Sequence, residues 1–164
     1  MEKKSIERLN ALHPLTREKA LVAYAEAVAK TPKGVHPFIT QTLRTFEESD
    51  ALYALGRTKV NPDGKTAKKP LGNIVTNAKA GQSYHNYGLA LDFCLQIDGK
   101  TSWGIDENWL LVIEIFKKHG FESGNDWKKF KDAPHLEMRM GNHWKQLLIL
   151  HNSGKIDKDG YVII

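Results

Sequence analysis

Two short segments of the chain carry histidine and aspartate side chains at spacings that suit a metal ion. The first, S-Y-H-N-Y-G-L-A-L-D, contains His85 and Asp92, and the second, D-A-P-H, contains Asp132 and His135. Two imidazoles and one carboxylate suit catalytic zinc, because three protein ligands leave the fourth tetrahedral position open. Spacing alone leaves a structural role equally open, because the chain has no self-sufficient motif such as H-E-x-x-H.

Asp132 precedes His135 by three residues, which would bring its carboxylate close to a metal-bound water without making it a ligand. Zinc lowers the pKa of a water that it binds to about 7. A nearby carboxylate can take the proton of that water and later pass it to a leaving amine. The four residues therefore favour amide hydrolysis, although Asp132 is also a plausible turn residue before Pro134.

The two segments resemble the signature of the zinc peptidases that cut peptidoglycan stem peptides, S-x-H-x-x-G-x-A-x-D followed by D-x-x-H or E-x-x-H. This family includes D-alanyl-D-alanine carboxypeptidases, vancomycin-resistance dipeptidases and the L-alanyl-D-glutamate endopeptidases of phage endolysins. Residues 39–45 resemble the family's strand and arginine, 51–57 the helix after it, and 121–127 the segment before the last ligand. The resemblance spans about residues 36–138.

The resemblance implies a role for each residue that matches a position of these motifs. His85, Asp92 and His135 would bind one zinc ion (Zn2+) per chain. Asp132 would be the catalytic general base for the attack of zinc-bound water on the scissile amide. These assignments come from the motif positions, and the chemistry of the four side chains agrees with them.

Two further residues, Arg44 and Ser83, match positions near the substrate in the family, and Trp127 ends the segment before the last ligand. Arg44 would hold the scissile carbonyl or a substrate carboxylate and stabilise the oxyanion, which makes it both catalytic and substrate-binding. Ser83 would contact the substrate or support the site, and Trp127 would border the cleft. Without the resemblance, the ordinary interpretation of Arg44 is a surface ion pair with Glu47 or Glu48.

The sequence D-x-x-H, rather than E-x-x-H, is more similar to the L-alanyl-D-glutamate endopeptidase branch of the family. We therefore expect a zinc metallopeptidase that hydrolyses the L-alanyl-D-glutamate bond of stem peptides. The alternatives are a D-alanyl-D-alanine carboxypeptidase or dipeptidase, and a non-catalytic zinc-binding module similar to Hedgehog-type signalling domains. A basic nucleic-acid binder is a further alternative, but the chain has no groove-reading motif.

Composition restricts where such an enzyme would act. The chain has 164 residues, a net charge of +5 and one cysteine, Cys94, so it favours an anionic partner and forms no intrachain disulfide. No apolar run follows the charged N-terminus, and none is long enough to span a membrane. We expect a monomer, made in the cytoplasm without a signal peptide, that reaches cell-wall peptidoglycan through a membrane lesion. Nucleic-acid binding and membrane insertion are not expected.

The elements that must position these residues indicate an α+β fold, with a small antiparallel sheet flanked by helices as in Hedgehog domains and D-Ala-D-Ala peptidases. The expected helices cover 15–30 (with Thr16 as N-cap), 46–55, 106–118 and 142–150. The expected strands cover 36–42, 89–97 and 135–138, followed by a hairpin over 155–164. The lysine-rich stretch 57–77 is expected to be a long surface loop. One catalytic domain would cover residues 1–164, with 139–164 as a C-terminal extension.

Overall fold

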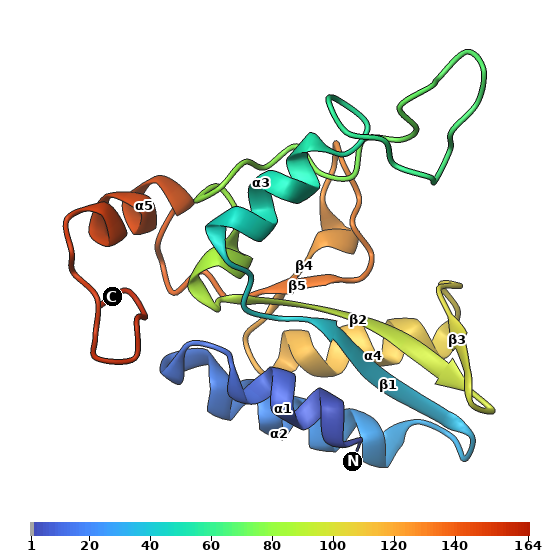
Figure 1. Ribbon diagram of the computed structural model, residues 1–164. Coiled ribbons are helices and arrows are strands. Elements are labelled where there is room, and N and C mark those ends of the chain that lie inside the picture. Colours follow the sequence, from blue (N-terminus) through green and yellow to red (C-terminus); the bar gives the residue numbers. More distant parts are fainter. Residues whose placement is uncertain (1) are drawn as a thin grey trace. The chain divides into compact units, whose positions relative to one another are not determined.

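The structure is a computed structural model that describes residues 2–164, shown in Figure 1. The α-helices are α1 (Lys3–Asn10), α2 (Pro14–Lys30), α3 (Phe46–Ala54), α4 (Glu107–Lys118) and α5 (Trp144–Asn152). The strands are β1 (Val35–Gln41), β2 (Ala90–Ile97), β3 (Lys100–Ser102), β4 (Glu122–Ser123) and β5 (His135–Glu137). Two short 3-10 helices, η1 (Tyr84–Tyr87) and η2 (Gly124–Asp126), precede β2 and β5. The mixed class and the antiparallel sheet confirm the predicted fold.

The strands form one antiparallel sheet in the order β1-β2-β5-β4, and β3 pairs with β2 beside this path. Strand β2 pairs with β1 in a register that places Cys94 opposite Phe38. Its first residues pair with β5, in a register that places Asp92 opposite His135. Strand β2 therefore pairs with β1 in the core of the sheet and also carries Asp92 next to His135, two of the ligands expected from the sequence.

Two compact units can be distinguished within the chain. The first comprises the residues up to Leu43 together with Tyr87–Met140, and it contains the whole sheet with α1, α2 and α4. The second comprises Arg44–Asn86 and Gly141–Ile164, and it contains α3, α5 and a long connection. The extent of the catalytic domain over the full chain stays a prediction. No helix in residues 2–164 combines the length and the apolar character needed to cross a membrane.

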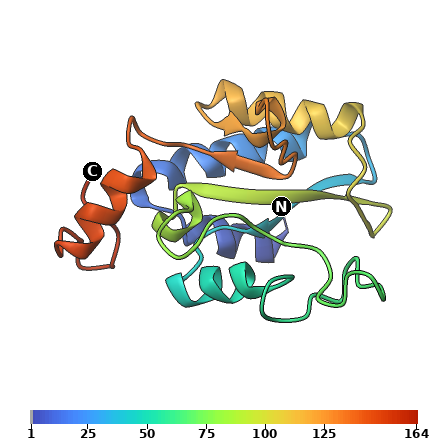
Figure 2. The same cartoon turned by 90° about the horizontal axis from the view of Figure 1, so that it is seen from above.

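The hydrophobic core of the first unit lies between the sheet and its three helices. Figures 1 and 2 show α1, α2 and α4 packed together against the strands. Phe93 of β2 packs against Trp109 of α4 with the rings tilted by 34° and their centroids 4.6 Å apart. Cys94 is only 1% exposed in this core, and burial raises the pKa of its thiol. Cys94 is therefore a small buried packing residue.

Local capping signals set the ends of several helices. Thr45 and Glu48 form a capping box at the start of α3, and Gly56 after its end has a φ of 74°. Asp106 caps α4 by accepting the backbone N–H of Trp109 at 2.9 Å. In place of the hairpin expected over 155–164, the structure has a single antiparallel bridge between Ile156 and Val162.

The N-terminal region differs from the prediction in two ways. Helix α2 begins at Pro14 with His13 as its N-cap, and Thr16 is a fully buried helical residue, so the predicted cap is wrong. Proline is favoured at the first helical position because its missing N–H would have no helical partner there. Helix α1 was not predicted, and Glu2 caps it by accepting the backbone N–H groups of Lys4 and Ser5.

The long connection between α3 and η1 contains only isolated bridges and turns. Asn61 and Asn73 organise it: the Asn61 side chain donates to the Asn73 carbonyl at 2.9 Å, and Asn73 N–H donates to the Asp63 carbonyl at 2.8 Å. Lysines at 59, 65, 68 and 69 are exposed along it. The predicted surface loop over 57–77 is thus confirmed.

Glu26 links two helices of the first unit and makes stability depend on pH. Its carboxylate accepts from Lys30 at 2.7 Å, from His119 at 2.7 Å and from Lys118 at 3.2 Å. These donors, led by Lys30, lower the pKa of Glu26 from 4.5 to about 2. Because the folded-state pKa is depressed, the contribution to stability is present above about pH 4.5 and is lost as the pH falls toward 2.

We expect Glu26→Gln to lower the melting temperature at pH 7 by about 1–3 °C, because the group is near the surface. The difference from the wild type should shrink as the pH falls from about 5 to about 3. Circular dichroism melting at several pH values measures both effects. Glu18→Gln, at an exposed position of the same helix, is the matched control. Equal melting of wild type and Glu26→Gln at pH 7 would contradict the assignment.

Candidate metal centre

Asp92 and His135 face each other across the junction of two strands. They are direct partners in the antiparallel register of β2 and β5, and such partners project to the same face of a sheet. Asp92 Oδ1 and His135 Nδ1 are 3.2 Å apart. Two ligand atoms of one tetrahedral zinc ion, each about 2.0–2.1 Å from the metal, lie about 3.3 Å apart. The separation therefore fits two donors that share one cation.

His85 is supplied by η1, directly ahead of β2. Gly88, with a φ of 67°, makes the predicted turn between them, a conformation that glycine adopts without strain. One potential ligand atom from each of His85, Asp92 and His135 lies within 4.8 Å of the others. The structure thus brings together the three side chains that the sequence proposed as ligands. Two imidazoles and a carboxylate are a donor set that zinc accepts.

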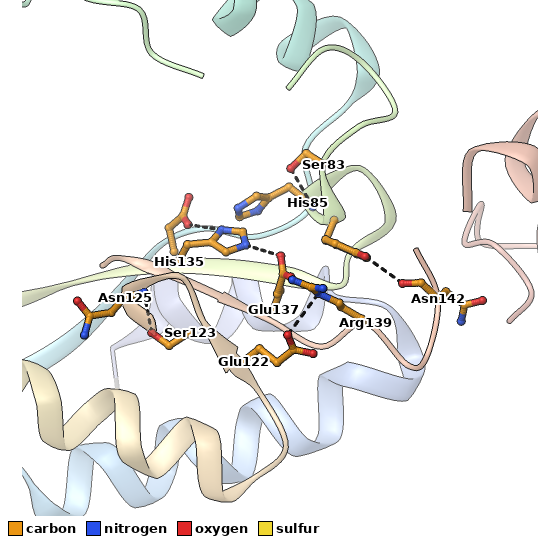
Figure 3. A network of polar contacts seen from close by, with 11 residues as sticks. Ser83, His85, Glu122, Ser123, Asn125, His135, Glu137, Arg139 and Asn142 are labelled. Carbon is orange, nitrogen blue, oxygen red and sulfur yellow. Dashed lines mark hydrogen bonds and ion pairs between the residues drawn. The ribbon is translucent and has the colours of Figure 1, made fainter. Parts of the chain in front are cut away.

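The surroundings of His135 are strongly negative. Its Nδ1 faces Asp92, and its Nε2 lies 2.9 Å from Oε2 of Glu137, a carboxylate that is only 2% exposed (Figure 3). Burial lowers the pKa of His135, but the hydrogen bonds and charges of Asp92 and Glu137 outweigh this effect and raise the pKa to about 9. Two carboxylates on opposite sides of the ring therefore favour a positive charge at this position.

Asp132 is tied to this centre through the backbone. Its N–H donates to the Gly124 carbonyl at 3.0 Å, and its carbonyl accepts the N–H of His135 at 3.1 Å. Asp132 is half-buried and is not one of the three clustered residues. The ring of Trp127, at the end of η2, lies 5.3 Å from the ring of His135. The segment between η2 and β5 thus carries both Asp132 and Trp127, the two candidate site residues that precede His135.

Arg44 and Ser83 lie along the backbone of His85. Arg44 N–H donates to the His85 carbonyl at 3.1 Å, and Ser83 Oγ accepts the N–H of His85 at 3.3 Å. Glu48, one of the ion-pair partners considered for Arg44, accepts the backbone N–H of Thr45 at 2.8 Å. The structure therefore associates both predicted substrate residues with the segment that carries His85.

Asn86 was missed by sequence reasoning, although it follows His85 within the first motif. Its side chain is buried and donates to the Arg44 and Thr45 carbonyls and to Ser49 Oγ at 2.8–3.1 Å. The side-chain Oδ1 of Asn86 accepts the N–H of Gly81 at 3.1 Å. Asn86 thus fixes the backbone on either side of His85, and a polar side chain next to a candidate ligand was the signal available for it.

Gly124 determines where the backbone of Asp132 can lie. A Cβ added at Gly124 would meet the Asp132 carbonyl oxygen at 2.4 Å and the Asp132 Cβ at 3.1 Å, so an alanine must displace this segment. A displacement of about 1 Å at a catalytic group can cost about 10²-fold in rate. We expect Gly124→Ala to lose about 10–100-fold in kcat and to keep its metal.

Kinetics and metal analysis of purified Gly124→Ala measure this effect. Gly104→Ala is the matched control, because a Cβ there meets only Ser102 Oγ at an ordinary 3.6 Å. A folded Gly124→Ala variant with full activity would show that Asp132 needs no exact placement.

Several known proteins and one family model are similar to this chain. Residues 76–138 match the family described as D-alanyl-D-alanine carboxypeptidase. The peptidoglycan L-alanyl-D-glutamate endopeptidase CwlK of Bacillus subtilis is 46% identical over 136 residues, which cover 77% of this chain and 73% of CwlK. An L-alanyl-D-glutamate peptidase of a Listeria phage is 28% identical over 139 residues, which cover 82% of this chain and 40% of the phage protein.

One solved structure extends the comparison to the fold. The crystal structure of the L-Ala D-Glu endopeptidase ChiX of Serratia marcescens matches with a TM-score of 0.59. The match covers 84% of this chain and 88% of the ChiX chain, at 18% sequence identity. At that identity the likeness supports the fold alone.

Proposed function

The chain belongs to the D-alanyl-D-alanine carboxypeptidase family of metallopeptidases, and we propose that it hydrolyses the bond between L-Ala and D-Glu in peptidoglycan stem peptides. The observation that carries the proposal is the convergence of His85, Asp92 and His135 in a chain 46% identical to an enzyme named for that bond. The aspartate of D-x-x-H, at Asp132, supports the same choice.

Zinc is the proposed metal, one ion per chain, with His85, Asp92 and His135 as its ligands. The set of two nitrogen donors and one oxygen donor suits zinc, and related divalent ions of the first transition row are the alternatives. When bound, zinc polarises a carbonyl and lowers the pKa of water to about 7. The buried imidazoles of His85 and His135 supply a rigid frame for it.

Asp132 is proposed to transfer the proton of the attacking water. Asp132 accepts a proton from the attacking water while the water oxygen bonds to the carbonyl carbon of L-Ala. The C–N bond then breaks, and Asp132 returns the proton to the amine nitrogen of D-Glu. The products are a carboxylic acid on L-Ala, which gives up its proton at neutral pH, and a free amine on D-Glu.

Arg44 is proposed to stabilise the negative charge that develops on the carbonyl oxygen, since a guanidinium offers several fixed donors. Ser83 is proposed to hold the segment of His85 in place and to contact the substrate. Trp127 is proposed to border the substrate, which its position beside the ring of His135 supports.

Peptidoglycan is the proposed partner, and the cell wall the proposed place of action. A net charge of +5 favours attraction to an anionic wall. We propose that the protein acts as a monomer without inserting into membranes, and that it reaches the wall through a membrane lesion.

Digestion of purified muropeptides, followed by mass spectrometry, tests the proposed bond. The expected products are a muramyl-L-Ala fragment and a peptide with a new D-Glu amine, formed with zinc and not formed with chelator. Release of terminal D-Ala instead would support the carboxypeptidase activity after which the matched family is described. One zinc ion per chain with no new amine at any stem-peptide bond would indicate a non-catalytic metal module.

A further inference from the structure

We propose that Glu137 is a positioning residue of the metal centre, which holds the imidazole of His135 so that Nδ1 is the atom presented to the metal. The inference rests on the proposed metal centre and adds a residue that lies outside its ligand set. Arg139 supports Glu137 in this arrangement. All of the contacts that carry the inference lie on β2, β4 and β5 or on the residues directly after β5.

The two ring nitrogens of His135 have different partners. Nδ1 lies 3.2 Å from Asp92 Oδ1, the distance expected between two donors of one cation. Nε2 lies 2.9 Å from Glu137 Oε2, and an ionised carboxylate can only accept, so Nε2 carries the proton. In the charged ring Nδ1 also carries a proton, and once a metal takes the place of that proton, the imidazole that keeps its proton on Nε2 presents the Nδ1 lone pair. Glu137 therefore selects the tautomer that can bind a metal beside Asp92.

The strand geometry explains why Glu137 reaches the ring. Residues two apart on a strand project to the same face, so His135 and Glu137 share one face of β5. In the register with β2, Glu137 lies opposite Ala90, whose small side chain leaves room beside the strand. A larger residue at that position would compete with the carboxylate for this space.

The carboxylate of Glu137 is buried and needs compensating donors, because an isolated buried charge is strongly unfavourable. His135 Nε2–H and Arg139 Nε–H provide them, the second at 2.5 Å from Oε1. Arg139 also lies 3.4 Å from Glu122 Oε2 on the neighbouring strand (Figure 3). These contacts connect the half-exposed Arg139, which also contacts Glu122, through Glu137 to the proposed ligand His135.

Partners of metal-binding histidines orient the ring and increase its basicity, and their loss typically costs about 10–100-fold in metal affinity. We expect Glu137→Leu, which removes the acceptor, to raise the zinc dissociation constant by about that factor. Glu137→Gln keeps an acceptor oxygen and should recover part of the affinity. Arg139→Gln, which leaves Glu137 in place, should have a smaller effect than Glu137→Leu.

Competition with a chromophoric chelator measures the zinc affinity of each variant, and circular dichroism establishes that each is folded. Glu114→Gln, an exposed glutamate on α4, is the control and should bind zinc like the wild type. If Glu137→Leu does not fold, the zinc affinities of Glu137→Gln and Arg139→Gln, each compared with the wild type, decide the question. Equal affinity of wild type and the folded Glu137 variants would overturn the inference.

Long-range proton–nitrogen NMR of the zinc-loaded protein reports the tautomer directly. We expect a metal-bound Nδ1 and a protonated Nε2 on His135 in the wild type, and a weaker preference in Glu137→Gln. A metal-bound Nε2 would overturn the inference even if zinc binds with full stoichiometry. A wild type that binds no zinc would instead remove the proposed metal centre, so the two failures can be told apart.

Discussion

Replacing Asp132 with asparagine is expected to lower kcat by about 10²–10⁴-fold, the usual contribution of a general base. Asparagine has nearly the same shape and keeps the backbone bonds to Gly124 and His135, but its amide cannot take a proton from water. Because Asp132 is not a proposed ligand, the variant should still bind one zinc ion. Rates of muropeptide cleavage and zinc content per chain are the two quantities to measure.

The control for this variant is Asp126→Asn, which makes the same change in η2 at a residue that pairs with Lys117 at 2.9 Å. That control should retain activity. Loss of zinc from Asp132→Asn would make Asp132 a ligand rather than the base. Unchanged activity in a folded, zinc-loaded Asp132→Asn would remove it from the chemistry altogether.

Removing the metal is expected to have the largest effect of all. Chelation, or the change Asp92→Ala, should reduce cleavage by at least about 10³-fold, because chelation removes the zinc, the two ligands left by Asp92→Ala hold it poorly, and without zinc the water is not activated. Added zinc should restore the chelated wild type and should not restore Asp92→Ala at the same concentration. Product formation and zinc content are followed together.

His36→Ala provides the comparison for metal removal, since His36 is an exposed histidine on β1. It should keep both zinc and activity. Full cleavage by a wild type shown to be free of metal would be incompatible with a metallopeptidase.

Local signals were sufficient to predict where α3 and α4 begin. The Thr45 and Glu48 pair, and Asp106 ahead of an amphipathic run, each act within one helical turn. Helix α1 escaped prediction because its eight residues are mostly polar. It is anchored by long-range bonds, such as that from Ile39 N–H to Ser5 Oγ at 3.1 Å, which join residues 34 positions apart.

The proposed ligands could be found from the sequence because motif spacing and family resemblance marked them. The contacts that support these ligands could not be predicted from the sequence, because they depend on how β2 pairs with β5. The register that places Asp92 opposite His135 joins residues 43 positions apart, and the same register brings Glu137 beside Ala90. The close packing of Gly124 on Asp132 is likewise a property of the folded backbone.

A crystal structure of the zinc-loaded protein, with diffraction data collected at the zinc absorption edge, tests the central claim most directly. The account predicts one anomalous peak per chain, about 2.0–2.2 Å from a nitrogen of His85, an oxygen of Asp92 and Nδ1 of His135. It also predicts that solvent, not protein, takes the fourth position. A peak elsewhere, a fourth protein donor, or three side chains that point apart would contradict it.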